Sequence, residues 1–97
     1  ELIMSVVILG GNECMVRKYK ELCTQYQCQA KVFAKPIGSL KNKLGSPDLL
    51  VCFTSAMSHK MLRSAMNELK GRGTVVAHCP TSSISALRGV LETHAVR

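Results

Sequence analysis

The stretch Leu2-Ile3-Met4-Ser5-Val6-Val7-Ile8-Leu9-Gly10-Gly11-Asn12 is the clearest indication of the fold. Its almost continuous run of branched apolar residues over 2–9 is typical of a parallel strand that is covered on both faces. Gly10 and Gly11 end the run and permit a sharp turn. Apolar positions then recur at helical spacing, which predicts a helix over about 13–27. The segment therefore predicts a strand that leads through a glycine turn into a helix.

The rest of the chain continues this alternation of strands and helices. Lys31 interrupts a second apolar run over 30–34, which is typical of an edge strand, and the polar stretch 35–47 predicts a loop. A buried strand over 49–53, a helix over 57–69, a strand over 74–77, a turn over 78–83 and a helix from Ile84 follow. This order predicts one α/β domain over 1–97, with an open, mainly parallel four-stranded sheet in the order 2-1-3-4, flanked by helices as in Rossmann and flavodoxin folds.

The composition limits the possible partners and the compartment. Lysine and arginine number 13 against 6 aspartates and glutamates, a net charge of +7, which favours anionic partners such as phosphorylated metabolites, carboxylates or nucleic acid. No apolar run approaches the roughly 20 residues of a membrane-spanning helix. The five cysteines are an odd number without a Cys-x-x-Cys pair, so we expect a reducing, cytoplasmic location rather than a disulfide scaffold or a four-thiolate zinc site.

The carboxyl ends of the strands are where a ligand is expected in such a sheet. Three segments lie there, namely 10–12, 54–60 and 78–83. Glycines let the backbone approach a ligand, and hydroxyls with free N–H groups at a helix start attract anions. The alternative is a tight turn and two capped helices with solvated basic residues. The candidate ligand-binding residues are Gly10, Gly11, Asn12, Thr54, Ser55, Ser58, Arg63, Thr81, Ser82 and Ser83.

The tripeptide His78-Cys79-Pro80 is the least ordinary stretch of the chain. A cysteine just before a helix start is expected to have a lowered thiol pKa. With a histidine beside it, Cys79 could ligate a metal or haem iron, or act as a redox-sensitive thiol. The alternative is that Cys79 fills a small buried space and Pro80 sets the start of the next helix.

Several enzyme classes lack their residues in this sequence. Asp48 is the only aspartate and precedes its strand, so a phospho-receiver cluster and a pair of catalytic carboxylates are missing. A phosphate-binding P-loop is absent, and no arginine closes the loop after Cys79. A binding or sensing module is therefore favoured over an enzyme.

Motifs along nearly the whole chain resemble the bacterial family catalogued as domain of unknown function 2325. That resemblance implies a small cytoplasmic α/β domain without an established general activity, of which some members bind haem at a dimer contact. It points to His59 and to the segment before Thr81, although Pro80 stands where members often have a histidine. The motifs that carry the resemblance are Val7-Ile8-Leu9-Gly10-Gly11 with Tyr19, 38–43, 45–49, Phe53-Thr54-Ser55, Ser58-His59-Lys60-Met61 and Thr81-Ser82-Ser83 with Ser85-Ala86-Leu87.

Together these observations favour a haem-binding module. His59, His78 and Cys79 are the candidate iron ligands, and Lys35 or Lys60 would pair with the haem propionates. A homodimer is expected, because four strands leave two edges open and 97 residues provide little wall for a haem. The alternatives are a regulatory domain that binds an anionic metabolite through Lys60, and a nucleic-acid-binding module that uses the basic span 17–43.

Overall fold

The computed structural model describes residues 4–34 and 44–94. Lys35, a candidate partner of the haem propionates, lies outside these ranges. The strands are β1 (Met4–Leu9), β2 (Cys28–Phe33), β3 (Leu49–Phe53) and β4 (Val75–Cys79), and the helices are α1 (Val16–Gln25), α2 (His59–Glu68) and α3 (Ile84–His94). Single 3₁₀ turns, η1 (Glu13–Met15) and η2 (Thr54–Ala56), follow β1 and β3.

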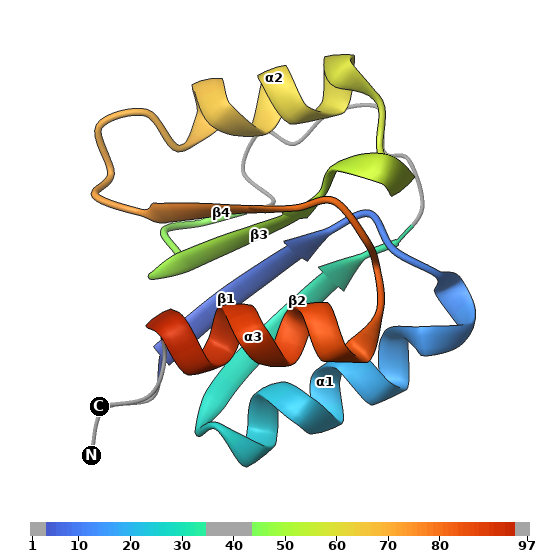
Figure 1. Ribbon diagram of the computed structural model, residues 1–97. Coiled ribbons are helices and arrows are strands. Elements are labelled where there is room, and N and C mark those ends of the chain that lie inside the picture. The colour runs from blue at the N-terminus through green and yellow to red at the C-terminus, as the bar shows by residue number, and fades with distance from the viewer. Residues whose placement is uncertain (1–3, 35–43, 95–97) are drawn as a thin grey trace.

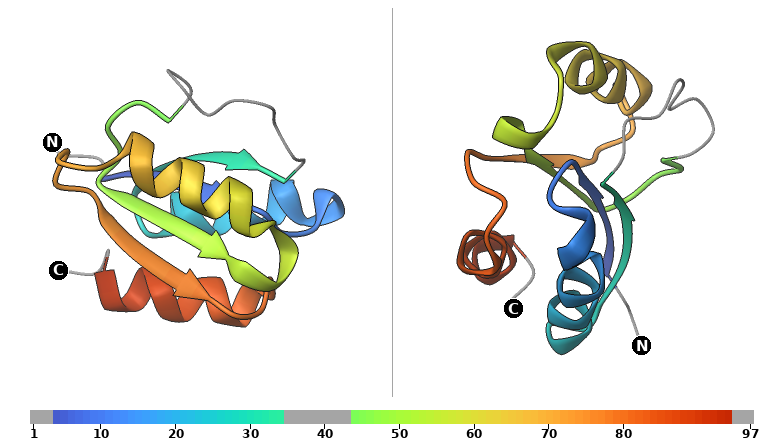
Figure 2. Two further views of the ribbon diagram at one scale, coloured as in Figure 1. Left: turned by 90° about the horizontal axis from the view of Figure 1, so that it is seen from above. Right: turned by 90° about the vertical axis from the view of Figure 1, so that its right-hand side faces the viewer.

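The four strands form an all-parallel sheet in the order β2-β1-β3-β4, as the sequence predicts. Helix α2 covers one face of the sheet, and α1 and α3 cover the other (Figures 1 and 2). No helix within the described ranges is long and apolar enough to cross a membrane.

The two faces of the sheet have separate apolar cores because strand side chains alternate between them. On β1, Val6 and Ile8 pack in the cluster with α1 and α3, whereas Val7 and Leu9 pack in the cluster with α2. All five residues of β3 are buried, which explains why the run 49–53 is apolar throughout.

The segment around the first helix differs in detail from its predicted form. Helix α1 begins at Val16 because the Asn12 side chain first caps η1, accepting a hydrogen bond of 2.9 Å from the N–H of Cys14. Strand β2 begins at Cys28, two residues before the predicted start, and Cys28 is buried. Lys31 lies on β2, which is an edge strand as predicted.

Two corrections concern the predicted site. His78 and Cys79 belong to β4 and not to the turn after it, because the strand continues with alternating exposed and buried residues after its apolar run ends. Helix α2 is capped by Ser58, whose hydroxyl accepts a hydrogen bond of 3.1 Å from the N–H of Met61. Helix α2 therefore begins at His59 rather than at position 57, and Thr54 and Ser55 belong to η2.

Candidate functional site

The three predicted segments meet at the carboxyl edge of the sheet. The Thr54 hydroxyl, after β3, donates a hydrogen bond of 3.4 Å to the carbonyl of Cys79 at the end of β4. The Tyr19 hydroxyl of α1 donates to the carbonyl of Ser82, at 2.6 Å, and accepts from the N–H of Asn12, at 3.3 Å. One buried phenol thus joins the loops after β1 and β4, a link that no local sequence pattern could have indicated.

The rim between these loops is filled on the side of α1 and α3. Tyr19 and Phe53 are both fully buried, and their ring centroids lie 5.4 Å apart. A Cβ atom on Gly11 would lie 3.0 Å from Tyr19 Cε2, and one on Gly10 would lie 3.1 Å from the carbonyl oxygens of Phe53 and Ala56. Both glycines also have positive φ. The chain's own packing therefore accounts for these glycines without a ligand.

His78 and Cys79 lie on opposite faces of the sheet. Cys52 is the register partner of His78 and packs under α2, so the His78 side chain lies on the α2 face. Phe53 is the partner of Cys79, and both pack in the cluster with α1 and α3. His78 is exposed, whereas Cys79 is only 4% exposed. The two side chains therefore cannot both reach an iron atom that is bound on one face of the sheet.

The thiol of Cys79 also differs from its predicted chemistry. Desolvation by burial raises its pKa, and a backbone hydrogen bond at Thr81 only partly opposes this. The expectation of a lowered pKa was wrong, because β4 continues through Cys79 and α3 begins only at Ile84. A neutral, buried thiol is a poor iron ligand and a poor redox sensor.

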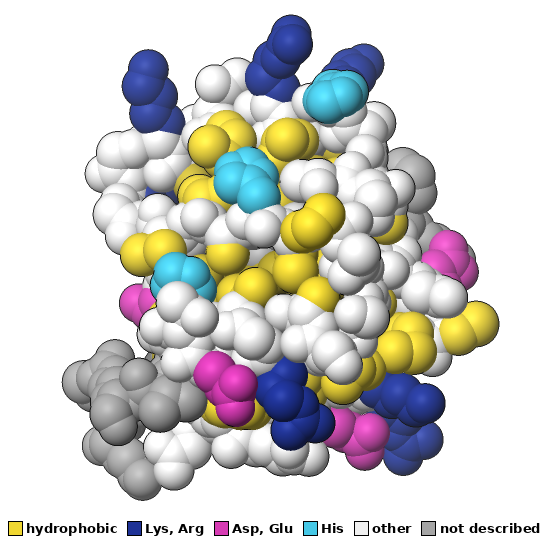
Figure 3. All heavy atoms as spheres, in the orientation of Figure 1, with side chains coloured by type: hydrophobic (Ala, Val, Ile, Leu, Met, Phe, Trp, Pro, Cys, Tyr) yellow, Lys and Arg dark blue, Asp and Glu magenta, His cyan; other side chains and the backbone are white. Residues whose placement is uncertain are grey.

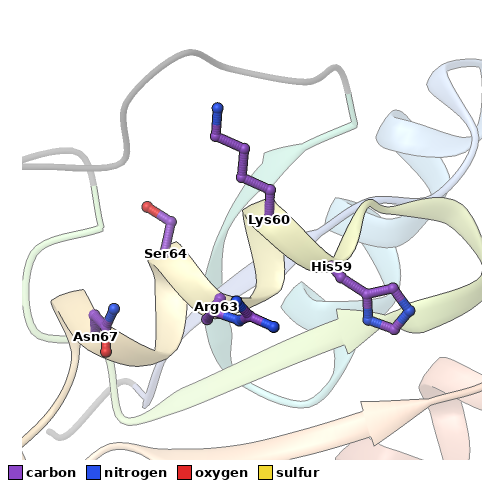
Figure 4. Close-up of a pocket in the computed structure, with 5 residues that line it drawn as sticks. All are labelled: His59, Lys60, Arg63, Ser64 and Asn67. Atoms are coloured by element: carbon purple, nitrogen blue, oxygen red, sulfur yellow. The ribbon is translucent and has the colours of Figure 1, made fainter.

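The first two turns of α2 form an exposed polar surface. His59 and Lys60 leave the first turn in different directions, and Arg63 lies one turn further along (Figure 4). An open hollow of about 390 Å³ is lined by these three residues together with Ser64 and Asn67. Ser64 and Asn67 were missed in the sequence, although their spacing from Lys60 places them on the same helix face.

The remaining hydroxyls of the predicted site have structural roles or are exposed. Ser83 caps α3, since its hydroxyl accepts a hydrogen bond of 3.1 Å from the N–H of Ala86, and it lies 3.4 Å from the Thr81 hydroxyl. Ser82 contributes its carbonyl to the contact with Tyr19. Ser55 is exposed on η2.

The basic surface proposed for nucleic acid is only partly described. Arg17, Lys18 and Lys20 are exposed on α1, and Lys31 is exposed on β2. The other lysines of the span lie outside the described residues. Tyr19, the aromatic residue among these cations, is fully buried and cannot stack on a base.

Within residues 4–34 and 44–94 there is no group of three or more histidine, cysteine, aspartate or glutamate side chains that could hold a metal ion. A metal site built from protein ligands alone therefore has no support there. Haem differs, because the porphyrin supplies four nitrogens and the protein supplies only axial ligands. Single exposed histidines are sufficient for that role.

Comparisons with known proteins identify a family. The family model described as "Uncharacterized protein conserved in bacteria (DUF2325)" matches residues 5–94. Comparisons with the curated proteins and with the solved structures found no match.

Proposed function

We propose that this chain, which belongs to the DUF2325 family of uncharacterised bacterial proteins, is a non-enzymatic module that binds haem on the α2 face of its sheet, at the carboxyl edge. The domain would serve as a haem-binding or haem-sensing unit. Its candidate iron ligands are His78 on β4 and His59 at the start of α2.

The observation that carries the proposal is the placement of two exposed imidazoles near one edge. His78 extends from the end of β4 on the face that α2 covers, and His59 is the first residue of α2. Both are exposed, so the ring nitrogens of each are accessible to a ligand from solvent. Imidazole is the commonest protein ligand of haem iron in oxygen carriers and peroxidases.

The surroundings of these histidines suit the two parts of a haem. Half-buried Met57, Leu62 and Val76 pack at the margin of the α2 core and offer apolar contacts to a porphyrin ring. Lys60 and Arg63 on α2 can form charge-assisted hydrogen bonds with propionates. Cys79 is left out of this site because it is buried on the other face.

Haemin titration followed by absorption spectroscopy tests this proposal. The wild-type protein is expected to develop a saturable Soret band. His78→Ala is expected to lower the affinity by at least about tenfold, which corresponds to about 1.4 kcal/mol, and His59→Ala to lower the affinity or shift the band. His94→Ala is the matched control, because His94 is an exposed histidine in the last turn of α3, on the opposite face of the sheet.

Two results would contradict the proposal. One is the absence of a saturable Soret band in the wild-type protein. The other is an unchanged band and affinity in the double variant His59→Ala/His78→Ala. Circular dichroism of each variant establishes that the fold is retained.

A second candidate function is binding of a phosphate-bearing metabolite, which the hollow on α2 favours. Lys60 and Arg63 supply positive charge there, and Ser64 and Asn67 supply hydrogen-bonding groups. Pyrophosphate should then raise the melting temperature of the haem-free protein, and Lys60→Ala should abolish the rise. Equal stabilisation of both proteins would argue against an anion site in this hollow.

A further inference from the structure

Strand β4 forms an edge of the sheet, and one row of its backbone groups points away from β3. The N–H of Val75 donates to the carbonyl of Asp48 at 3.1 Å, so Val75 directs its backbone groups toward β3. Since this direction alternates along a strand, Ala77 and Cys79 also face β3, whereas Val76 and His78 face outward. Among the described residues, no strand pairs with this outer side of β4.

The residues of β4 do not protect that edge. Proteins commonly guard edge strands with lysine, proline or other charged side chains. β2, the other edge strand, carries Lys31. β4 contains only Val75, Val76, Ala77, His78 and Cys79, without lysine, arginine, aspartate, glutamate or proline.

Apolar side chains flank this edge on both faces of the sheet. Val75 is 47% exposed, and half-buried Val76 packs at the margin of the core on the α2 face. Val75 lies on the face of α1 and α3, because its register partner Leu49 packs there. Figure 3 shows apolar side chains and histidines together on the side of the molecule where β4 lies between α2 and α3.

We propose that β4 is an interface at which a second copy of this chain pairs antiparallel, joining two four-stranded sheets into one of eight strands. The outward residues, Val76 and His78, are placed symmetrically about Ala77. When Ala77 of each copy lies on the two-fold axis, Val76 of one copy lies opposite His78 of the other, and the two residues exchange both backbone hydrogen bonds. The strand thereby pairs its outward backbone groups in a closed, isologous contact.

The charge distribution disfavours an acidic partner at β4 and leaves this strand as a cation-free surface at which two copies can meet. Each chain carries +7, so two copies repel one another unless they meet through a surface without cations. β4 is such a surface, whereas an acidic partner would be drawn to the lysines and arginines elsewhere. Pairing also places His78 of each copy on the same face of the joined sheet, so a second copy adds surface beside the proposed haem site. The inference therefore deepens the proposed function, although its evidence comes from β4 alone.

Sedimentation velocity of the haem-free protein at micromolar concentrations tests the inference independently of haem. We expect the wild-type protein to be a dimer and Val75→Lys to be a monomer. Val75 is about half exposed, so the lysine leaves the core intact. Gln29→Lys is the matched control, because Gln29 is an exposed residue of the other edge strand and its variant should remain a dimer. A monomeric wild-type protein, or a dimeric Val75→Lys variant, would overturn the inference.

A cross-link tests the register. Ala77 faces Ala77 of the second copy as a non-hydrogen-bonded pair, in which the Cβ atoms approach closely enough for a disulfide. In a Cys14→Ser background, which removes the exposed thiol, Ala77→Cys should give a covalent dimer under mild oxidation, and the background alone should not. A dimer that fails to cross-link through position 77 would disprove the proposed two-fold pairing.

Discussion

The two faces of the sheet are closed to different degrees. On one face α1 and α3 lie side by side, and the Tyr26 hydroxyl of the loop after α1 donates to Glu92 of α3, at 3.1 Å (Figure 2). On the other face α2 is the only helix of the described chain. The fully buried aromatic pair Tyr19 and Phe53 lies on the two-helix face, whereas the exposed His59 and His78 lie on the one-helix face.

This difference indicates which part of the carboxyl edge is the better candidate for a ligand site. In an open α/β sheet the whole edge is a candidate, and the sequence offers residues along all of it. The rings of Tyr19 and Phe53 occupy the part near α1 and α3. The part near α2 carries the exposed His59 and His78, so the functional proposals concentrate there.

The largest expected effect tests the closure of the two-helix face. Phe53→Ala should lower the free energy of unfolding by about 3–5 kcal/mol, because it leaves a cavity against Tyr19 and Gly11. Met61→Ala, on the α2 face, should cost less, about 2 kcal/mol, since Met61 lies at the margin and is 8% exposed. Urea denaturation followed by circular dichroism measures both. A larger loss of stability in Met61→Ala than in Phe53→Ala would contradict the view that the two-helix face is the more tightly packed one.

An intermediate effect separates stability from binding. Ser58 and Ser83 cap α2 and α3 through hydrogen bonds of the same length, 3.1 Å. Each serine-to-alanine variant should lose about 1 kcal/mol of stability. Only Ser58→Ala should weaken haem binding, because it loosens the turn that carries His59. Equal loss of haem affinity in both variants would show that the two faces are not functionally distinct.

The smallest expected effect is a pH dependence of the free energy of unfolding, which arises from one buried thiol on each face of the sheet. Burial raises the pKa of Cys23, on α1, from 9.0 to about 12, and that of Cys52, under α2, to about 11. Above pH 9.0 the unfolded chain loses these protons while the folded chain keeps them, so the free energy of unfolding should fall as pH rises toward 11 and 12. The decline should be absent at neutral pH and smaller in Cys23→Ala, measured by urea denaturation at several pH values. A pH-independent stability in this range would contradict the assigned burial.

Much of the fold could be predicted from apolar periodicity. The run 49–53 matches β3 residue for residue, and the strand order follows from short parallel connections. The end of β4 could not be predicted in the same way, because the apolar run stops at Ala77 while the strand continues to Cys79. The start of α2 was misplaced since Thr54, Ser55 and Ser58 are all suitable caps, and only tertiary packing selects Ser58.

The candidate site was predictable at the level of segments but not of side-chain direction. The loops after β1, β3 and β4 do meet, as parallel topology requires. Whether His78 and Cys79 share a face depends on whether they lie in a strand or in a turn, and a pattern of two residues does not decide that. The role of the Tyr19 hydroxyl depends on Ser82, 63 residues further along the chain, so no local spacing could have indicated it.

The alternation at the end of β4 has a consequence for how this domain can diversify. One peptide bond separates a solvent-facing imidazole from a thiol embedded among the side chains near α3. Position 78 can therefore exchange its side chain without disturbing the packing around position 79. A substitution at position 78 can therefore alter the proposed haem site while position 79 keeps the architecture constant.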